Sequence, residues 1–148
     1  MKRFLFTLII ALSAAFAQAG ERGTVEEARH LVDKAAALMR TAGPARALAE
    51  FSNPQGSFAY RDLYIVVIDQ HGIVRAHGTL PHMIGQNVAN WRDADDRYVM
   101  RELLQRARRG ETGPIHYKRP YLGTDQVRLK TTWFRQVNGY VILCGAYP

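Results

Sequence analysis

The sequence contains a single cysteine, Cys144, so no disulfide can form within the chain. Cys144 lies in an apolar run that we predict to be a buried strand, where a thiol behaves as a small hydrophobic side chain. The other interpretation, a catalytic nucleophile, requires an activating partner. No serine or cysteine stands in a recognisable nucleophile motif, and no glycine-rich phosphate-binding loop is present. We therefore expect no catalytic residue and no cofactor, and we do not expect an enzyme.

Long hydrophobic runs are also missing, except at the amino terminus. Lys2 and Arg3 precede an apolar run over residues 4–16, and residues 17–19 read Ala-Gln-Ala, which is typical of a secretory signal peptide with its cleavage site. The run is shorter than the roughly 20 residues that span a bilayer. We therefore expect residues 1–19 to be a signal peptide and residues 20–148 to form one periplasmic or secreted domain, without a membrane span after cleavage. The alternative is a segment that is kept as a membrane anchor.

Acidic residues are too few to balance the basic ones. The 20 lysines and arginines exceed the 13 aspartates and glutamates, which gives a formal net charge of +7. A strongly basic protein raises the question of nucleic-acid binding, but export argues against it, and we expect no nucleic-acid partner. The excess charge is compatible with an anionic ligand or partner, and also with a merely solvated basic surface.

The spacing of apolar residues predicts three helices. A capping-box pattern at residues 24–27 begins the first, and its apolar stripe continues at helical spacing until Gly43 ends it. A second, shorter helix follows directly. For the third helix, we expect Asp93 or Asp95 to be the N-terminal cap.

Runs of β-branched and aromatic residues predict five strands. The first covers residues 63–69, the second residues 73–77 and the third residues 115–118, and a long hairpin supplies two more. Residues 78–91 form a long connection whose apolar side chains argue against disorder, so we expect it to be functional. Five antiparallel strands with the helices gathered on one side make a single α+β domain.

The hairpin turns at Asn138-Gly139, a dipeptide that suits a two-residue turn because both of its residues adopt a positive φ. Such a turn fixes the register, which places Lys130 opposite Tyr147 and Thr132 opposite Gly145 on one face. Gly145 has no side chain, so we expect it to leave a gap there that a small ligand can fill.

The order of short motifs along the chain resembles that of a known family. The first half contains FSNP at 51–54, DLYIVVID at 62–69, HG at 71–72 and AHG at 76–78. The second half contains Pro81, IGQN at 84–87, DAD at 93–95, Gly113, Tyr117, Lys130 and GAY at 145–147. Together these pieces are similar to the single Cache domain of type 2, over nearly the whole chain from the first predicted helix onward.

The resemblance implies a PAS-like Cache fold, with a long N-terminal helix packed on a five-stranded antiparallel sheet. It also implies an extracytoplasmic sensor that binds a short organic acid or a similar anionic metabolite in a pocket over the sheet. The chain ends at Pro148 without an output segment, so we expect it to act through a separate partner, a membrane receptor or a periplasmic protein. Lys118 and Arg119 stand where the family often has an aromatic residue. We therefore expect the shape and charge of the pocket rim to differ from the family pattern.

Four residues offer polar groups for such a pocket. Lys130 is the strongest candidate, because its ammonium can bind a carboxylate through a charge-assisted hydrogen bond. The alternative is a lysine at the end of the sheet that extends into water. Tyr64, Tyr117 and Tyr147 supply hydroxyl donors, or they are core aromatic residues with solvated tips.

Two further candidates, His77 and Trp91, lie at the start and at the end of the long connection. His77 is placed to donate to a carboxylate, and Trp91 to cover the pocket; each is also explained as an ordinary strand-end or packing residue. His71, His77 and His82 invite a metal site, and residues 93–96 a calcium loop, but neither spacing matches a known pattern, so we expect no metal. A protein-interaction module without a small ligand is the alternative function, followed by a metal-binding protein.

Overall fold

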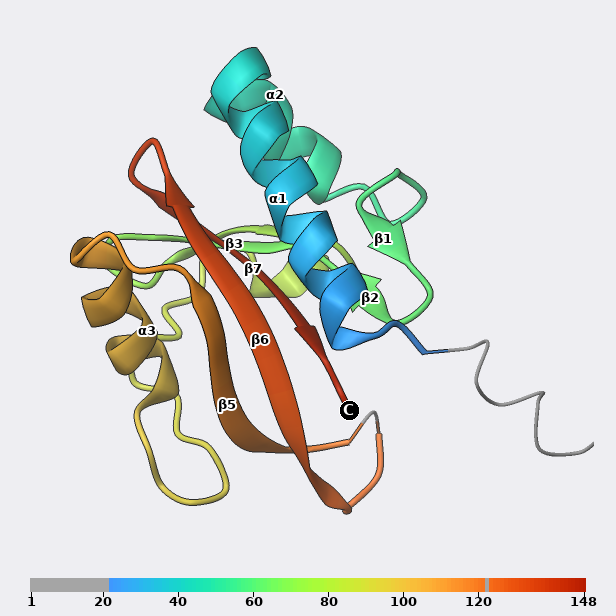
Figure 1. Cartoon of the computed structure of the whole chain (residues 1–148), viewed down its shortest axis with the longest axis vertical. Helices are drawn as coiled ribbons and strands as arrows, with labels where there is room; N and C mark the ends of the chain where they lie inside the picture. Colours follow the sequence, from blue (N-terminus) through green and yellow to red (C-terminus); the bar gives the residue numbers. More distant parts are fainter. Residues whose placement is uncertain (1–21, 122) are drawn as a thin grey trace, which may run out of the picture.

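A computed structural model describes residues 22–121 and 123–148 (Figure 1). The predicted signal peptide, residues 1–19, lies outside these residues and stays a prediction. The helices are α1 (Val25–Ala42), α2 (Pro44–Phe51), the short 3-10 helix η1 (Pro81–Met83) and α3 (Val99–Arg108). The strands are β1 (Ala59–Tyr60), β2 (Leu63–Tyr64), β3 (Val66–Asp69), β4 (Val74–His77), β5 (Gly113–Pro120), β6 (Val127–Val137) and β7 (Tyr140–Ala146). Within the described ranges, no helix is both long and apolar enough to cross a membrane.

Helix α1 begins and ends as the sequence predicts. The Glu27 backbone N–H donates to Thr24 Oγ1 at 3.1 Å, and the Thr24 backbone N–H donates to Glu27 Oε2 at 2.7 Å. These two bonds form the capping box, which satisfies two backbone donors at the first turn. The helix ends at Gly43, whose φ of 80° is readily adopted only by glycine.

The main sheet has five antiparallel strands in the order β4-β3-β7-β6-β5. Its longest hairpin, β6–β7, turns at Asn138 and Gly139, whose φ angles are 51° and 80°. Thr132 pairs with Gly145 in the register that the sequence predicts. The turn therefore determines which face each hairpin side chain occupies, and this includes the face that carries the site.

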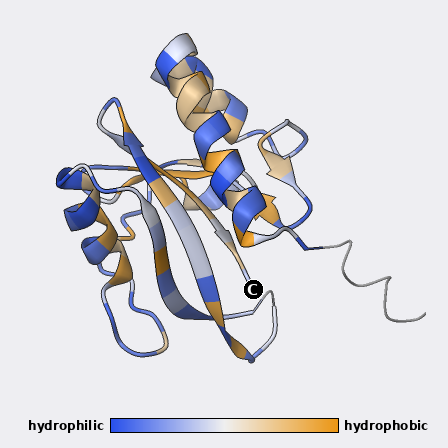
Figure 2. Cartoon of the chain, in the orientation of Figure 1, coloured by the Kyte–Doolittle hydropathy of each residue, from blue (hydrophilic) through white to orange (hydrophobic). Residues whose placement is uncertain are grey.

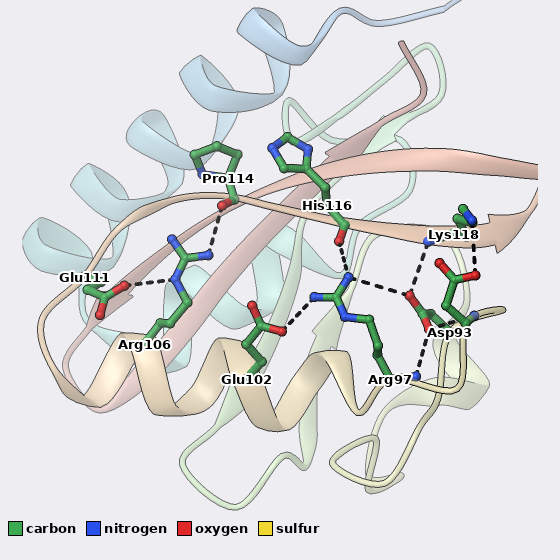
Figure 3. Close-up of polar contacts among 9 residues, drawn as sticks. Asp93, Arg97, Glu102, Arg106, Glu111, Pro114, His116 and Lys118 are labelled. Atoms are coloured by element: carbon green, nitrogen blue, oxygen red, sulfur yellow. Dashed lines mark hydrogen bonds and ion pairs between the residues drawn. The ribbon is translucent and has the colours of Figure 1, made fainter.

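Helices cover both faces of this sheet. Along β3, Val67 packs into the core beneath α1 and α2, whereas the next residue, Ile68, packs into the core on the α3 side. Figure 3 shows α3 on one side of the strands and α1 on the other, and in Figure 2 strands β3 and β7 carry most of the hydrophobic colour of the sheet. The prediction that the helices gather on one side is wrong, because strands that are apolar at successive positions need cover on both faces.

The predicted strand over residues 63–69 is divided at Ile65. β2 pairs with β1 in a separate two-stranded sheet, whereas β3 joins the main sheet. Ile65 keeps its backbone hydrogen bonds: its N–H donates to the Phe58 carbonyl at 3.3 Å, and its carbonyl accepts from the Gly78 N–H at 2.9 Å. Tyr64 remains on the same side as Val66, and both line the cavity described below.

Strand β5 is an edge strand that is longer than predicted, and arginines close its outer edge (Figure 3). Arg106 on α3 donates from Nη1 to the Pro114 carbonyl at 3.0 Å, and Arg97 donates from Nη1 to the His116 carbonyl at 3.0 Å. An open edge strand would present these carbonyls to another chain. The arginines therefore protect the edge and tie α3 to the sheet.

Asp93 holds the segment before α3. Its side chain is fully buried, and its Oδ1 accepts from the backbone N–H groups of Asp95 at 3.0 Å and Arg97 at 2.9 Å. Burial by itself raises the pKa of Asp93, but hydrogen bonds from the backbone of Arg97, Lys118 and Asp95 outweigh burial and lower it. The expected helix cap is wrong, because the residue before α3 is Tyr98, which gives no side-chain cap.

Replacing Asp93 with alanine is expected to lower the free energy of unfolding at pH 7 by about 3 kcal/mol, because buried N–H groups lose their acceptor. The lowered pKa means that this contribution is present above the unfolded pKa and is lost as the pH falls through the folded pKa. Urea unfolding at neutral and acid pH measures both effects. Asp95→Ala, which removes a half-exposed ion pair with Lys118, is the control and should lose less than about 1 kcal/mol. Equal losses in the two variants would contradict the role given to Asp93.

Candidate functional site

A cavity of about 140 Å³ lies on the face of the sheet that α3 covers. Its wall of strands carries apolar side chains from β3, β4 and β7: Val66, Ile68, Val74 and Leu143. Its cover comes from the predicted functional connection and from α3: Leu80, Met83, Val88, Trp91 and Met100. The polar side chains gather from β2, β4, β5 and β6: Tyr64, His77, Tyr117, Arg119, Lys130 and Thr132. Among residues 22–121 and 123–148, no aspartate or glutamate lines the cavity.

Lys130 carries the charge at the polar end. It is only 7% exposed, and its ammonium lies 5.7 Å from the centre of the Tyr64 ring and 5.0 Å from that of Tyr147. Within the described part of the chain, its Nζ has no hydrogen bond or ion pair. Burial, reinforced by the nearby Arg119 guanidinium, lowers the pKa of Lys130 to about 8. A buried cation without a counter-ion favours binding of an anion.

Gly145 lies directly beneath this lysine. A Cβ at Gly145 would lie 2.4 Å from Lys130 Cε and 2.4 Å from Thr132 Oγ1. The lysine side chain therefore fills the space over Gly145, and the prediction of an open gap for a ligand there is wrong. The glycine instead lets the lysine side chain cross β7 and reach the cavity.

His77 is held as a neutral hydrogen-bond donor. Its Nδ1 accepts from the backbone N–H groups of Thr79 at 3.3 Å and Leu80 at 3.0 Å, which leaves the proton on Nε2. Burial lowers the pKa of His77 to about 4, and the positive charge of Arg119 adds to the effect. The ring also stacks on Tyr64, with 5.0 Å between the ring centres. His77 therefore offers an uncharged N–H beside the two cations.

Protonation of His77 is expected to destabilise the protein. Because the folded pKa is lower than the ordinary 6.5, the unfolded chain binds the proton more tightly, and stability falls as the pH drops from about 6.5 to about 4. His77→Gln should remove a loss on the order of 1 kcal/mol, since solvent at the cavity mouth screens part of the charge. Thermal unfolding of both proteins from pH 7 to pH 4 measures the difference. The exposed His71→Gln is the control, and a wild-type pH profile that matches His77→Gln would contradict the assignment.

Tyr117 on β5 and Trp91 at the end of the long connection together form one wall of the cavity. The Tyr117 hydroxyl lies 2.9 Å from Thr132 Oγ1, and burial raises its pKa, so it stays a protonated donor. The Trp91 ring meets the Tyr117 ring edge-on at 5.6 Å, and the Arg119 guanidinium lies 5.5 Å from the Trp91 ring centre. Trp91 thus both lines the cavity and fastens the connection to β5.

Tyr147 is the one predicted site residue that does not line the cavity. Its hydroxyl donates to the Pro120 carbonyl at 3.2 Å, and its ring meets Tyr121 edge-on at 4.9 Å. The side chain lies behind Lys130, whose ammonium it contacts with the ring face. The other five predicted residues come together around one cavity: Tyr64, His77, Trp91, Tyr117 and Lys130.

Sequence reasoning missed Arg119 and Thr132 as site residues. From the sequence, Arg119 is named only as a residue of the rim that departs from the family pattern, and the predicted strand ends at residue 118. β5 extends to residue 120, and strand alternation then places Arg119 on the same face as Tyr117. Thr132 was already on the Lys130 face in the predicted register, so the same alternation would have identified it.

Chemically, the cavity has two halves. One half brings together two cations, Lys130 and Arg119, with the His77 N–H and hydroxyl groups, and the other half is apolar. This lining is chemically complementary to a molecule with one anionic group and a small apolar body. An apolar cavity of about 150 Å³ holds benzene, so this cavity has room for about six non-hydrogen atoms.

Two other kinds of group, the Cys144 thiol and the possible metal ligands, were considered in the sequence as alternative sites. Cys144 is 1% exposed, and burial raises its pKa to about 12, so the thiol stays protonated and unreactive, as expected for a small hydrophobic residue. In residues 22–121 and 123–148, no three histidine, cysteine, aspartate or glutamate side chains lie close enough together to hold a metal ion.

A long helix packed on a five-stranded antiparallel sheet, with a cavity over the sheet, is the PAS-like architecture. The model of the single Cache domain 2 family matches residues 6–148, and the chain belongs to this family. Cache domains are extracytoplasmic domains that bind small ligands.

Solved structures of similar fold agree with this assignment. The periplasmic sensor domain of a chemotaxis protein is 23% identical, with a TM-score of 0.61 over 82% of this chain and 88% of that one. A Cache chemosensory domain studied for carboxylic acid recognition is 22% identical, with a TM-score of 0.61 over 82% and 86%. A methyl-accepting chemotaxis protein from Vibrio parahaemolyticus is 16% identical, with a TM-score of 0.62 over 83% and 95%.

Proposed function

We propose that this protein is a periplasmic or secreted sensor domain that binds a short carboxylate in the cavity over its sheet. The observation that carries the proposal is that Lys130 and Arg119 both line a small cavity to which the described residues contribute no acidic side chain. Recognition of carboxylic acids by a Cache domain of similar fold supports it.

The two halves of the cavity have separate roles in this proposal. Lys130 and Arg119 neutralise the carboxylate through charge-assisted hydrogen bonds, and the His77 N–H fixes its orientation without adding charge. The apolar half, between β3 and Met100, receives a short aliphatic tail. Tyr117 and Trp91 exclude water from the bound acid. The proposed activity is binding of the acid.

The test compares acids with their uncharged amides in thermal unfolding of the purified protein. A saturating acid at about 100 times its Kd should add about 2.7 kcal/mol to the free energy of unfolding. We expect stabilisation by acetate, propionate or butyrate and none by the matched amides, which have nearly the same shape. Lack of stabilisation by every short acid, or equal stabilisation by propionamide and propionate, would overturn the proposal.

The signal is proposed to pass from the bound domain to a separate protein, a membrane receptor or a periplasmic partner. The connection over residues 78–91, which contains Trp91, is proposed to transmit the signal. It lies over the cavity and contacts β5 through Tyr117 and Arg119. Cross-linking in cells with and without propionate tests this step. A partner whose cross-linking is unchanged by the ligand, or by Lys130→Met, would instead indicate an interaction module that needs no small ligand.

A further inference from the structure

The lysines of the described chain have very different surroundings. Lys34 is exposed, and Lys118 is about half exposed and paired with Asp95 at 3.1 Å. Lys130, in contrast, is 7% exposed, faces the cavity and has no carboxylate partner within the described residues. Its Nζ is thus shielded from bulk water and open to a molecule bound in the cavity.

This environment favours the neutral amine. Burial in low dielectric disfavours the ammonium, and a neighbouring guanidinium disfavours it further, which is how amines are activated as nucleophiles in proteins. The pKa of about 8 means that a substantial fraction of Lys130 is uncharged just above neutral pH, whereas an ordinary lysine titrates at 10.5. Arg119 stays charged and remains available to an anion.

We propose that Lys130 captures small 2-oxo acids covalently and reversibly, as an imine at their carbonyl carbon, while Arg119 binds the carboxylate. The inference rests on the proposed carboxylate site and names a substrate class for it. A 2-oxo acid carries its carbonyl next to its carboxylate, and the Lys130 amine and the Arg119 guanidinium both line the cavity and are near enough for Arg119 to act on the charge of Lys130. Pyruvate has a methyl group for the apolar half, and its size suits a cavity of about 140 Å³.

The chemical step balances without any additional reagent. The lone pair of Lys130 Nζ attacks the carbonyl carbon, a C–N bond forms, and the carbonyl oxygen takes up a proton to give a carbinolamine. The oxygen then leaves as water with both hydrogens of the amine, and a C=N bond remains. The His77 N–H and the Thr132 hydroxyl lie in the cavity to bind the oxygen during this exchange. Hydrolysis reverses the step and releases the acid.

The groups that set the charge of Lys130 come from every strand around it. Tyr64 lies on β2, His77 on β4, Tyr117 and Arg119 on β5, Cys144 on β7, and Tyr147 directly after β7. Asp62 also acts on the ammonium and opposes its deprotonation, but burial and Arg119 outweigh it. We expect imine formation to accelerate as the pH rises from 6 to 8, since the neutral amine is the reacting form.

The experiment treats the full chain with pyruvate and sodium cyanoborohydride, which reduces an imine to a stable amine, and locates the product by peptide mass spectrometry. We expect one adduct per chain, at Lys130, formed more than about tenfold faster than at Lys34 or Lys118, since each unit of pKa changes the neutral fraction about tenfold. Excess propionate should protect Lys130 and leave the slow labelling of Lys34 and Lys118 unchanged.

Lys130→Arg keeps the positive charge and removes the nucleophile. It should lose the adduct at position 130. Labelling spread evenly over Lys34, Lys118 and Lys130, or an unlabelled Lys130 in a wild-type protein that binds propionate, would overturn the imine and leave the carboxylate site intact. Failure of both propionate stabilisation and labelling at Lys130 would overturn the carboxylate site as well.

Discussion

Lys130→Met is expected to abolish binding of carboxylates and, in the same protein, to raise the free energy of unfolding at pH 7 by about 2 to 3 kcal/mol. The wild-type ammonium is buried without a counter-ion, and this lowers its pKa from 10.5 to about 8. Each pKa unit corresponds to about 1.4 kcal/mol, so removing the charge relieves most of that penalty. Methionine has a similar length and suits the apolar contacts of the side chain.

The pH dependence gives this prediction a second readout. Between about pH 8 and pH 10.5 the unfolded chain still holds the lysine proton that the folded chain has lost, so wild-type stability rises with pH in this window. The advantage of Lys130→Met should therefore be largest below pH 8 and shrink toward pH 10.5. Urea unfolding with and without propionate measures both effects. Lys118→Met, at an exposed site on β5, is the control and should change neither.

A less stable Lys130→Met would contradict the account, because it would show that the lysine is stabilised by partners within the fold. Unchanged propionate binding would contradict it separately. The combination of a more stable protein and lost binding is specific to a residue kept for function, since substitutions of merely structural residues usually lower stability.

Gly145→Ala is expected to weaken propionate binding by about 10- to 100-fold, equivalent to losing one charge-assisted hydrogen bond of about 1.5 to 3 kcal/mol. The new Cβ would lie 2.4 Å from Lys130 Cε, so the flexible lysine side chain must move away from the cavity. The glycine has no positive φ, so alanine fits its backbone and the domain should remain folded.

Calorimetric titration with propionate measures this loss, and circular dichroism confirms folding. Gly56→Ala is the matched control: its Cβ would approach only Asn53, outside the site. Binding by Gly145→Ala at wild-type affinity would show that the position of the Lys130 ammonium over Gly145 is irrelevant to recognition.

Much of this architecture was predictable from local sequence. The Asn138-Gly139 turn fixes the hairpin register, and through it the face shared by Lys130 and Thr132. The capping box at Thr24 fixes the start of α1. In both cases neighbouring residues decide the geometry, because the hydrogen bonds span only a few positions in the chain. The family resemblance, which rests on many such local pieces, is confirmed.

The parts that were mispredicted depend on contacts between distant residues. Asp93 looks like a helix cap in sequence, but its carboxylate also accepts from the backbone of Lys118, 25 residues away. Arg119 enters the site only because β5 continues past residue 118. The space over Gly145 is filled by Lys130 from the neighbouring strand, and no local pattern specifies which rotamer that lysine adopts. Side-chain packing across the sheet decides each of these.

The proposed site combines three features that would act together on one small anion. A desolvated lysine and an arginine supply charge, His77 supplies an N–H that remains neutral at physiological pH, and Trp91 covers the bound molecule. The neutral histidine matters because a third full charge would repel the other two. The lysine is the most sensitive of the three, since its charge state depends on whether an anion is present.

The central claim is that Lys130 holds a buried charge for a small acid, and NMR of the Lys130 side chain tests it most directly. Protein labelled with ¹³C and ¹⁵N in lysine has few signals to assign, because the chain has few lysines. We expect a Lys130 pKa of about 8 in the free protein, and a clear rise when propionate binds, because the carboxylate favours the ammonium. A Lys130 that titrates at its ordinary 10.5 and does not respond to propionate would contradict it.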